Sequence, residues 1–212
     1  MLFRSRWVDS AIAVQQLRED QKEKSLGTVY IVSGLPRSGT SMCMQMLVNG
    51  GLEVLTDDER LADESNPKGY FEFEKVKSLR KNKRWLARAK NKVVKVVAPL
   101  LGYLPDNYHY KVVFMERGLK QVLSSQHKML VSLGKAKAGN YHASMEKAFE
   151  KELLKAKNWM KRGHVECLYV SYEQVMQEPR KEAERINQFF DQQMDVEKML
   201  QAVDPQLHRN RG

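Results

Sequence analysis

Short runs of apolar, largely β-branched residues recur along the chain, separated by longer segments whose apolar residues recur at helical spacing. The runs predict strands over 28–33, 92–97, 110–116 and 165–171. The longer segments predict helices over 39–49, 73–90, 118–133, 143–162 and 179–192. Apolar side chains also share one helical face over 8–23, so we expect an N-terminal helical extension within residues 1–25.

The alternation of strands and helices favours an α/β fold, a three-layer sandwich with a mainly parallel central sheet between two helical layers. The chain has 212 residues and shows neither an internal repeat nor a low-complexity linker, so one domain over 1–212 is expected. Ligands on such sheets bind at the carboxyl ends of the strands. The loops that follow the strands are therefore the candidate functional segments.

Composition supports a globular protein, with 42% hydrophobic and 29% charged residues. No apolar run approaches the roughly 18 residues of a spanning helix, and the N-terminus lacks the apolar core of a secretory signal. Cys43 and Cys167, the two cysteines, both lie in apolar stretches and are expected to be buried free thiols. These features together predict a cytoplasmic protein without a membrane span.

The positive charge is concentrated in one segment. The formal net charge is +10, and residues 75–95 contain ten Lys or Arg and no acid, so the rest of the chain is neutral. Such a run attracts polyanions, phosphorylated ligands or acidic membranes, or else it forms a solvated helix face with no partner.

The segment from Gly34 to Ser41 has the strongest chemical signal. Its two glycines have the G-x-x-x-x-G spacing of a phosphate-binding loop, between a predicted strand and a predicted helix. Glycines let successive N–H groups turn inward, and the helix N-terminus adds partial positive charge. Nucleotide hydrolases place a Lys where this chain has Thr40, and the cation is instead Arg37 in the loop. The loop therefore suits a terminal phosphate better than triphosphate cleavage.

The run PRSGTS after a hydrophobic strand resembles the 5′-phosphosulfate loop of the sulfotransferase family. These enzymes use 3′-phosphoadenosine 5′-phosphosulfate (PAPS) as sulfuryl donor and release 3′,5′-adenosine bisphosphate (PAP). The resemblance implies that the loop holds the 5′-phosphosulfate, with Arg37 reaching the transferring group. The residues so implied are Pro36, Arg37, Ser38, Gly39, Thr40 and Ser41.

A second signature of that family is an Arg at a strand end followed eight residues later by a Ser, both contacting the donor's 3′-phosphate. Arg117 and Ser125 match it here, although Gly118 and Leu119 replace the acid and Pro that usually follow the Arg. The guanidinium fork of an Arg at a strand's carboxyl end can bind a phosphate through two N–H groups.

The C-terminal stretch resembles the same family at four further positions, which we interpret as packing residues: Tyr172, Pro179, Ile186 and Phe189. The resemblance covers about residues 28–190.

Sulfuryl transfer also needs a base for the acceptor's proton. Several branches of the family use a Glu shortly after the helix that follows the loop, which favours Glu59, with Asp58 close behind. The cytosolic branch uses a His, for which His109 is the candidate, and Glu72 is a third possibility. Each acid could equally be a solvated carboxylate.

Two lysines of a predicted strand, Lys92 and Lys95, could steady the sulfonate if they faced the crevice. We expect them instead to be solvated at a sheet edge.

The resemblance thus predicts a PAPS-dependent sulfotransferase acting on a hydroxyl or amine of a small-molecule or glycan acceptor, with no metal required. One alternative is a P-loop kinase or nucleotide-binding protein that uses Glu116 as a metal-holding carboxylate. Another is a nucleic-acid-binding module that uses residues 75–95, which the absence of interleaved aromatics disfavours.

Overall fold

The computed structural model describes residues 27–57, 69–135, 143–191 and 194–204, and the expected N-terminal extension lies outside them. In chain order the elements are β1 (Thr28–Gly34), α2 (Thr40–Asn49), η1 (Glu74–Ser78), η2 (Arg84–Arg88), β2 (Val93–Lys95), η3 (Ala98–Tyr103), β3 (His109–Glu116), α3 (Leu119–Ser132), α4 (Ala143–Trp159), β4 (Val165–Ser171), α5 (Tyr172–Gln177), α6 (Pro179–Phe189) and α7 (Val196–Leu200), the η elements being 3₁₀-helices.

The strands form one four-stranded sheet in the order β2-β1-β3-β4, and every pair is parallel. In the central pair, Val32 of β1 lies opposite Val113 of β3. The segment before the gap at 58–68 extends along the outer side of β2, where Val54 forms a parallel bridge with Val93. The predicted parallel α/β sheet is thereby confirmed.

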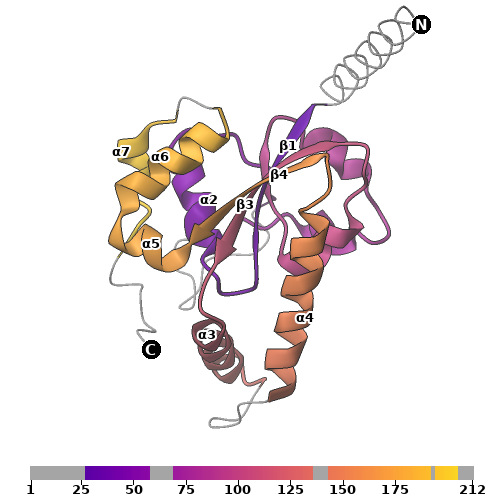
Figure 1. Ribbon diagram of the computed structural model, residues 1–212, viewed down its shortest axis with the longest axis vertical. Helices are drawn as coiled ribbons and strands as arrows, with labels where there is room; N and C mark the ends of the chain where they lie inside the picture. Colours follow the sequence, from indigo (N-terminus) through magenta and orange to yellow (C-terminus); the bar gives the residue numbers. More distant parts are fainter. Residues whose placement is uncertain (1–26, 58–68, 136–142, 192–193, 205–212) are drawn as a thin grey trace, which may run out of the picture.

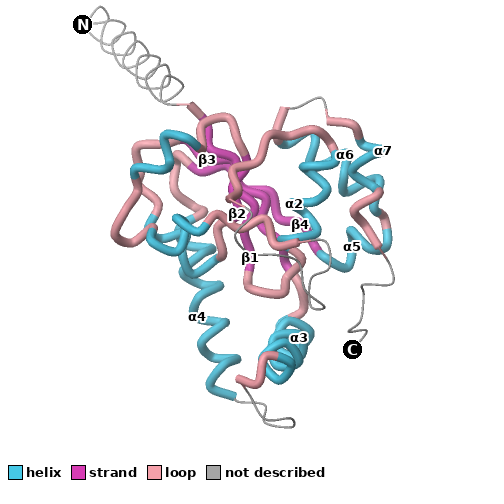
Figure 2. The backbone as a smooth tube through the Cα atoms, turned by 180° about the vertical axis from the view of Figure 1, so that it is seen from behind, coloured by secondary structure: helices cyan, strands magenta, loops and turns pink. Residues whose placement is uncertain are grey.

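Helical layers cover both faces of the sheet (Figures 1 and 2). One apolar cluster joins the sheet to α2, α5, α6 and α7. The second cluster joins the opposite face to the three 3₁₀-helices and α4. The three-layer arrangement places the carboxyl ends of β1 and β3 side by side, because these strands are neighbours and run in the same direction.

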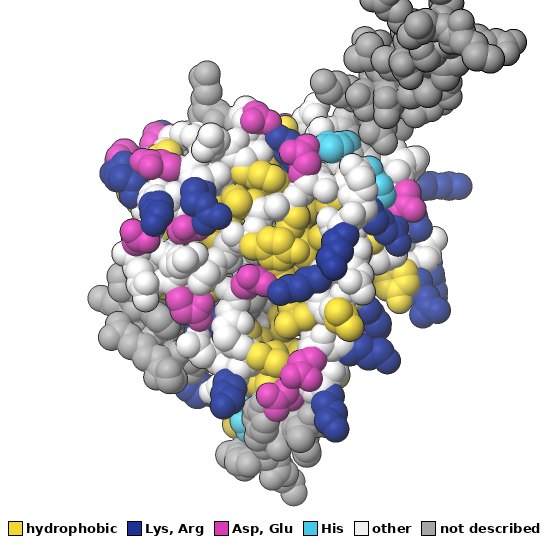
Figure 3. Space-filling view, in the orientation of Figure 1, with side chains coloured by type: hydrophobic (Ala, Val, Ile, Leu, Met, Phe, Trp, Pro, Cys, Tyr) yellow, Lys and Arg dark blue, Asp and Glu magenta, His cyan; other side chains and the backbone are white. Residues whose placement is uncertain are grey.

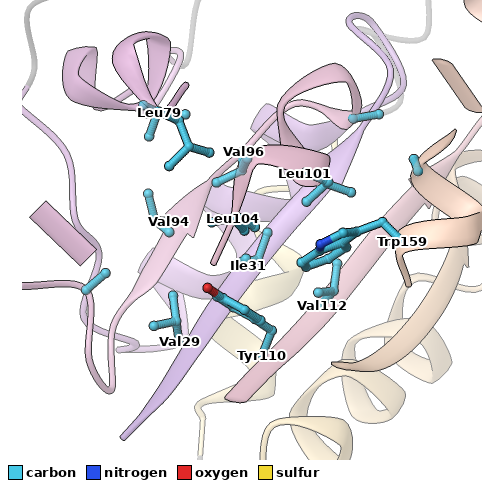
Figure 4. Close-up of a cluster of buried hydrophobic side chains, with 14 of the residues drawn as sticks. Val29, Ile31, Leu79, Val94, Val96, Leu101, Leu104, Tyr110, Val112 and Trp159 are labelled. Atoms are coloured by element: carbon cyan, nitrogen blue, oxygen red, sulfur yellow. The ribbon is translucent and has the colours of Figure 1, made fainter. Parts of the chain in front are cut away.

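Figure 4 shows how the second cluster is built. Side chains from three strands interdigitate with those of the covering layer, namely Val29, Ile31, Val94, Val96, Val112, Leu79, Leu101 and Trp159, all at most 3% exposed. Burying one such side chain contributes roughly 1.5–3 kcal/mol, so this layer rigidly supports the strand ends.

The segment predicted as one helix over 73–90 is two short 3₁₀-helices, so that prediction was wrong. Five consecutive polar residues over 80–84 provide no apolar anchor between the buried Leu79 and Trp85. The Asn82 side chain accepts a hydrogen bond from the Arg84 N–H at 3.1 Å, offering the backbone an alternative to a continuous helix.

Two short α-helices, α5 and α7, were not predicted, because five or six residues are too few to show a period. Side-chain caps stabilise both: Ser171 accepts from Gln174 N at the start of α5, and Asp195 accepts from Lys198 N at the start of α7. Of the two free cysteines, Cys43 is buried as expected, whereas Cys167 is half-buried. No helix in the described part of the chain is long and apolar enough to cross a membrane.

Candidate phosphate-binding site

The loop between β1 and α2 is shaped by two glycines. A Cβ at Gly34 would lie 2.4 Å from Ser38 Oγ and 2.6 Å from Met115 O, so only glycine allows the loop to fold back here. Gly39 has φ +102°, and a Cβ there would lie 2.6 Å from the Tyr172 ring. The loop is therefore packed tightly between β3 and the start of α5.

The N-terminus of α2 has the features of an anion site. Its N-cap is Gly39, which has no side chain to cap the helix, and the first turn carries no acid. The first helical bond runs from Cys43 N to Gly39 O, so the earlier N–H groups have no acceptor within the helix. They carry partial positive charge toward the loop. Ser38 and Thr40 are buried at this turn.

Arg37 links the loop to the second motif. It adopts φ +71°, and its Nε donates a hydrogen bond to Ser125 Oγ at 3.0 Å. In the other direction, Arg117 Nη1 donates to the Arg37 carbonyl oxygen at 3.2 Å. The structure thus brings together the three side chains that the two motifs single out, across 88 and 80 residues of sequence.

Arg117 is held from two sides. Its guanidinium lies 4.2 Å from the centre of the Tyr172 ring, and its Nε donates to Gln121 Oε1 at 3.0 Å. Burial lowers the pKa of Arg117, an effect opposed by Tyr172 and Glu173. Because the pKa of arginine starts so high, the group remains a cation at neutral pH. Its planar fork is thereby presented at the carboxyl end of β3, beside the loop.

Lys95 is the clearest error of the sequence interpretation. It is buried rather than solvated, and its Nζ donates to Ser41 Oγ at 3.0 Å and to Tyr70 O at 2.8 Å. Residues 53–55 cover the outer side of β2, which explains why a lysine on this strand is shielded from water. A second cation thus touches the phosphate loop. Lys92 is partly exposed and pairs with Glu53, as a solvated edge residue would.

The base candidates fall in different places. Asp58 and Glu59 lie outside the described residues. His109 begins β3, at the amino edge of the sheet, where it pairs with Glu166 at 2.7 Å. The phosphate loop follows the opposite end of the neighbouring strand, so His109 is ruled out as the base. Glu72 lies with its Oε1 4.0 Å from Lys95 Nζ, close to the loop.

The remaining candidates have ordinary surroundings. Glu116, the carboxylate of the kinase alternative, pairs with Lys157 at 2.9 Å on the surface. Trp85 of the basic run is buried, so it offers no stacking platform. Within the described ranges, no group of three or more His, Cys, Asp or Glu side chains is placed to hold a metal.

A parallel α/β sheet, a glycine-shaped loop leading into a helix N-terminus after β1 and an arginine held in place after β3 together form a candidate phosphate-binding site. The model of the sulfotransferase family matches residues 53–196, and the chain therefore belongs to the sulfotransferase family. The matched segment begins after the loop and includes Lys95, Arg117 and Ser125. No curated protein sequence matches this chain.

Solved structures of sulfotransferases share the fold. The sulfotransferase domain of the Synechococcus PCC 7002 olefin synthase is 14% identical, with a TM-score of 0.51 over 88% of this chain and 80% of that one. Mouse sulfotransferase SULT7A1, solved in complex with PAP, is 13% identical, with a TM-score of 0.55 over 88% of this chain and 68% of that one. At such identities the comparison establishes the fold.

Two site residues escaped the sequence interpretation. The sequence did single out Lys95, since a charge within a β-branched run is either solvated at an open sheet edge or buried with polar partners. We expected the first, and the structure shows the second. Tyr172 was interpreted as a packing residue, and it also stacks on Arg117. No sequence pattern pairs a tyrosine at a strand end with an arginine 55 residues earlier.

Proposed function

We propose that this sulfotransferase uses PAPS as its sulfuryl donor and releases PAP. The observation that carries the proposal is the direct contact between the loop and the second motif through Arg37, Ser125 and Arg117. A donor with phosphate groups at both the 3′ and 5′ positions needs two cationic sites that are close together and fixed relative to one another. The described residues supply such a pair.

In this proposal the 5′-phosphosulfate lies on the first turn of α2. The loop residues Pro36, Ser38, Gly39, Thr40 and Ser41 surround it, and the backbone N–H groups of Gly39, Thr40 and Ser41 bind its oxygens. Pro36 has no N–H, and the Ser38 N–H donates to Leu35 O within the loop. The two cations of this site are Arg37, within the loop, and Lys95, which contacts the loop at Ser41. They would stabilise the negative charge that develops as the sulfuryl group leaves the donor.

The 3′-phosphate is assigned to Arg117 and Ser125. Tyr172 and Gln121 orient the Arg117 guanidinium, so the fork is held in place before a ligand arrives. The Ser125 hydroxyl, buried at the second turn of α3, adds a donor. No metal takes part in this scheme, because the two arginines and Lys95 supply the positive charge.

The base is assigned to the acids that follow α2, with Glu59 first and Asp58 second, as the family's pattern implies. Glu72 is the alternative because its Oε1 lies 4.0 Å from Lys95 Nζ, beside the loop. The base would take the proton of an acceptor hydroxyl or amine on a small molecule or a glycan.

Calorimetric titration with PAP and, separately, with ATP·Mg tests the proposal. We expect wild type to bind PAP with a micromolar Kd, and Arg37→Ala and Arg117→Ala to weaken binding at least about tenfold each, as removal of a charged hydrogen bond does. Arg84→Ala, an exposed arginine of η2, is the matched control and should bind as wild type does. Failure to bind PAP, or tighter binding of ATP·Mg, would reject the donor assignment.

A further inference from the structure

β4 is an edge strand with little protection. It is the last strand in the sheet order, and the described residues place no strand on its outer side. Natural edge strands are usually short or carry Lys, Pro or a bulge, which prevents pairing with another chain. β4 spans seven residues, contains neither Lys nor Pro, and has Glu166 as its single charge.

The direction of the β4 backbone groups follows from one hydrogen bond. Tyr110 N of β3 donates to His164 O, so the residue just before β4 points its carbonyl toward β3. Backbone direction alternates along a strand. Val165, Cys167, Tyr169 and Ser171 therefore turn their N–H and C=O groups to the open edge. Arg185 Nη2 lies 3.4 Å from the backbone carbonyl oxygen of Tyr169, which makes a long and weak hydrogen bond.

The surface around this edge is apolar. Figure 3 shows hydrophobic side chains gathered across the centre of the face that carries β4 in Figure 1. Tyr169 is 40% exposed and Leu154, on the neighbouring α4, is 63% exposed. Lys157 of α4 lies 5.7 Å from the centre of the Tyr169 ring, which places α4 beside the same edge.

A second copy fits this edge in one register. When two β4 strands pair antiparallel about a two-fold axis at Leu168, the outward-facing residues lie opposite one another: Cys167 faces Tyr169 of the second copy, and Val165 faces Ser171 of the second copy. Every outward N–H and C=O then meets a partner. The small Cys167 faces the large Tyr169, and the two Leu168 side chains meet at the axis.

The charges also match under this symmetry. Glu166 is paired with His109 and Lys111 on the face covered by α6, and its side chain is 50% exposed. In the proposed register Glu166 lies opposite Val170 of the second copy. It is then next to Tyr169 of the second copy, whose carbonyl oxygen is approached by Arg185 of that same copy. The Arg185 side chain is 39% exposed; its Nη1 pairs with the buried Glu182 at 2.5 Å, so its Nη2 is the nitrogen that faces the edge. Two symmetric Glu166–Arg185 contacts would form, since in a two-fold interface each contact occurs twice.

We infer that β4 is a homodimer interface. Two copies of this chain pair their β4 strands antiparallel, and their two sheets become one continuous sheet. A peptide strand from another protein would pair with the same backbone groups. It would not by itself supply the Glu166–Arg185 contacts or the fit of Cys167 against Tyr169 that the two-fold axis provides. The inference does not depend on the sulfuryl donor.

Light scattering coupled to size-exclusion chromatography tests the inference on the full chain. We expect a dimer at about 100 µM and dissociation on dilution, as for a micromolar Kd. Tyr169→Lys should give monomers, because it places two like charges on the edge. Leu133→Lys, which replaces a 51% exposed apolar residue just after α3, should remain dimeric. Thermal unfolding followed by circular dichroism checks that both variants fold.

Cysteine cross-linking tests the register. Under oxidation, Leu168→Cys should form a disulfide-linked dimer, because opposite residues at the axis have Cα atoms about 4.5 Å apart. Val165→Cys on the same edge should not cross-link, since it faces Ser171 of the second copy. Monomers at every concentration, a dimer that Tyr169→Lys leaves intact, or equal cross-linking of both cysteine variants would each overturn the proposal.

Discussion

Arg37 Nε donates a hydrogen bond to Ser125 Oγ at 3.0 Å, joining the loop after β1 to the second turn of α3. The two residues belong to motifs that could have been unrelated. Their contact means that a group bound at one motif lies within reach of the other. This relationship is the basis for assigning both motifs to one donor with two phosphate groups.

Ser125→Ala should weaken PAP binding about tenfold, equivalent to about 1.4 kcal/mol for the loss of one hydrogen bond to a charged group. The neighbouring Ser124→Ala serves as control, because it removes the same hydroxyl from the adjacent position of the helix. Calorimetry compares the two variants. Equal effects, or none at Ser125, would remove this residue from the 3′-phosphate site.

Lys95→Met should slow PAPS turnover about 10²-fold or more, the effect of removing one group that stabilises developing charge. The methionine retains the apolar stem, which keeps β2 packed. Lys92→Met, on the exposed end of the same segment, should turn over PAPS at the wild-type rate. The rate of PAP release measures turnover in both variants. A fully active Lys95→Met would show that the role of this lysine is purely structural.

Gly39→Ala should destabilise the protein more than Gly51→Ala. Both glycines have positive φ, near +100°, which costs an alanine roughly 1–2 kcal/mol. A Cβ at Gly39 also meets the Tyr172 ring, whereas nothing lies within 4 Å of one at Gly51. Urea denaturation should show an additional loss of about 1–3 kcal/mol for Gly39→Ala. Equal losses of unfolding free energy in the two variants would show that the Tyr172 ring moves aside at little cost.

The protein should lose stability above about pH 9. Burial raises the pKa of Cys43 from 9.0 to about 12. The folded state therefore keeps this proton while the unfolded chain releases it. The stabilisation is fully present below the unfolded pKa and is lost as the pH rises toward the folded value. Between pH 8 and 10, Cys43→Ala should lose about 1 kcal/mol less stability than wild type, measured by urea unfolding.

The sequence predicted the sheet well because each strand is a compact apolar run flanked by breaks, and β4 matches its predicted range of 165–171. The loop between β1 and α2 could be predicted because its glycines and its flanking strand and helix are contiguous in the sequence. Arg117 and Ser125 needed the family's spacing, since an Arg and a Ser eight residues apart carry little information alone.

What the sequence could not provide depends on packing between distant segments. The burial of Lys95 follows from the coverage of β2 by residues 53–55 and from the position of Tyr70, neither of which is visible in the alternation of the strand. The stacking of Tyr172 on Arg117 depends on β3 and β4 being neighbours, and strand order is not encoded locally. His109 stayed an open candidate for the base at the level of sequence, because its distance from the loop depends on how the strands are arranged in the sheet.

The most direct test of the central claim compares PAP with 5′-AMP, which lacks the 3′-phosphate, on wild type, Arg37→Ala and Arg117→Ala. We predict that wild type prefers PAP at least about 100-fold, as an arginine–phosphate contact with a supporting hydroxyl allows. Arg117→Ala should reduce this preference below about tenfold, whereas Arg37→Ala should weaken both ligands and keep most of it. Equal affinity of wild type for the two ligands, or an unchanged preference in Arg117→Ala, would contradict a donor site built from these two motifs.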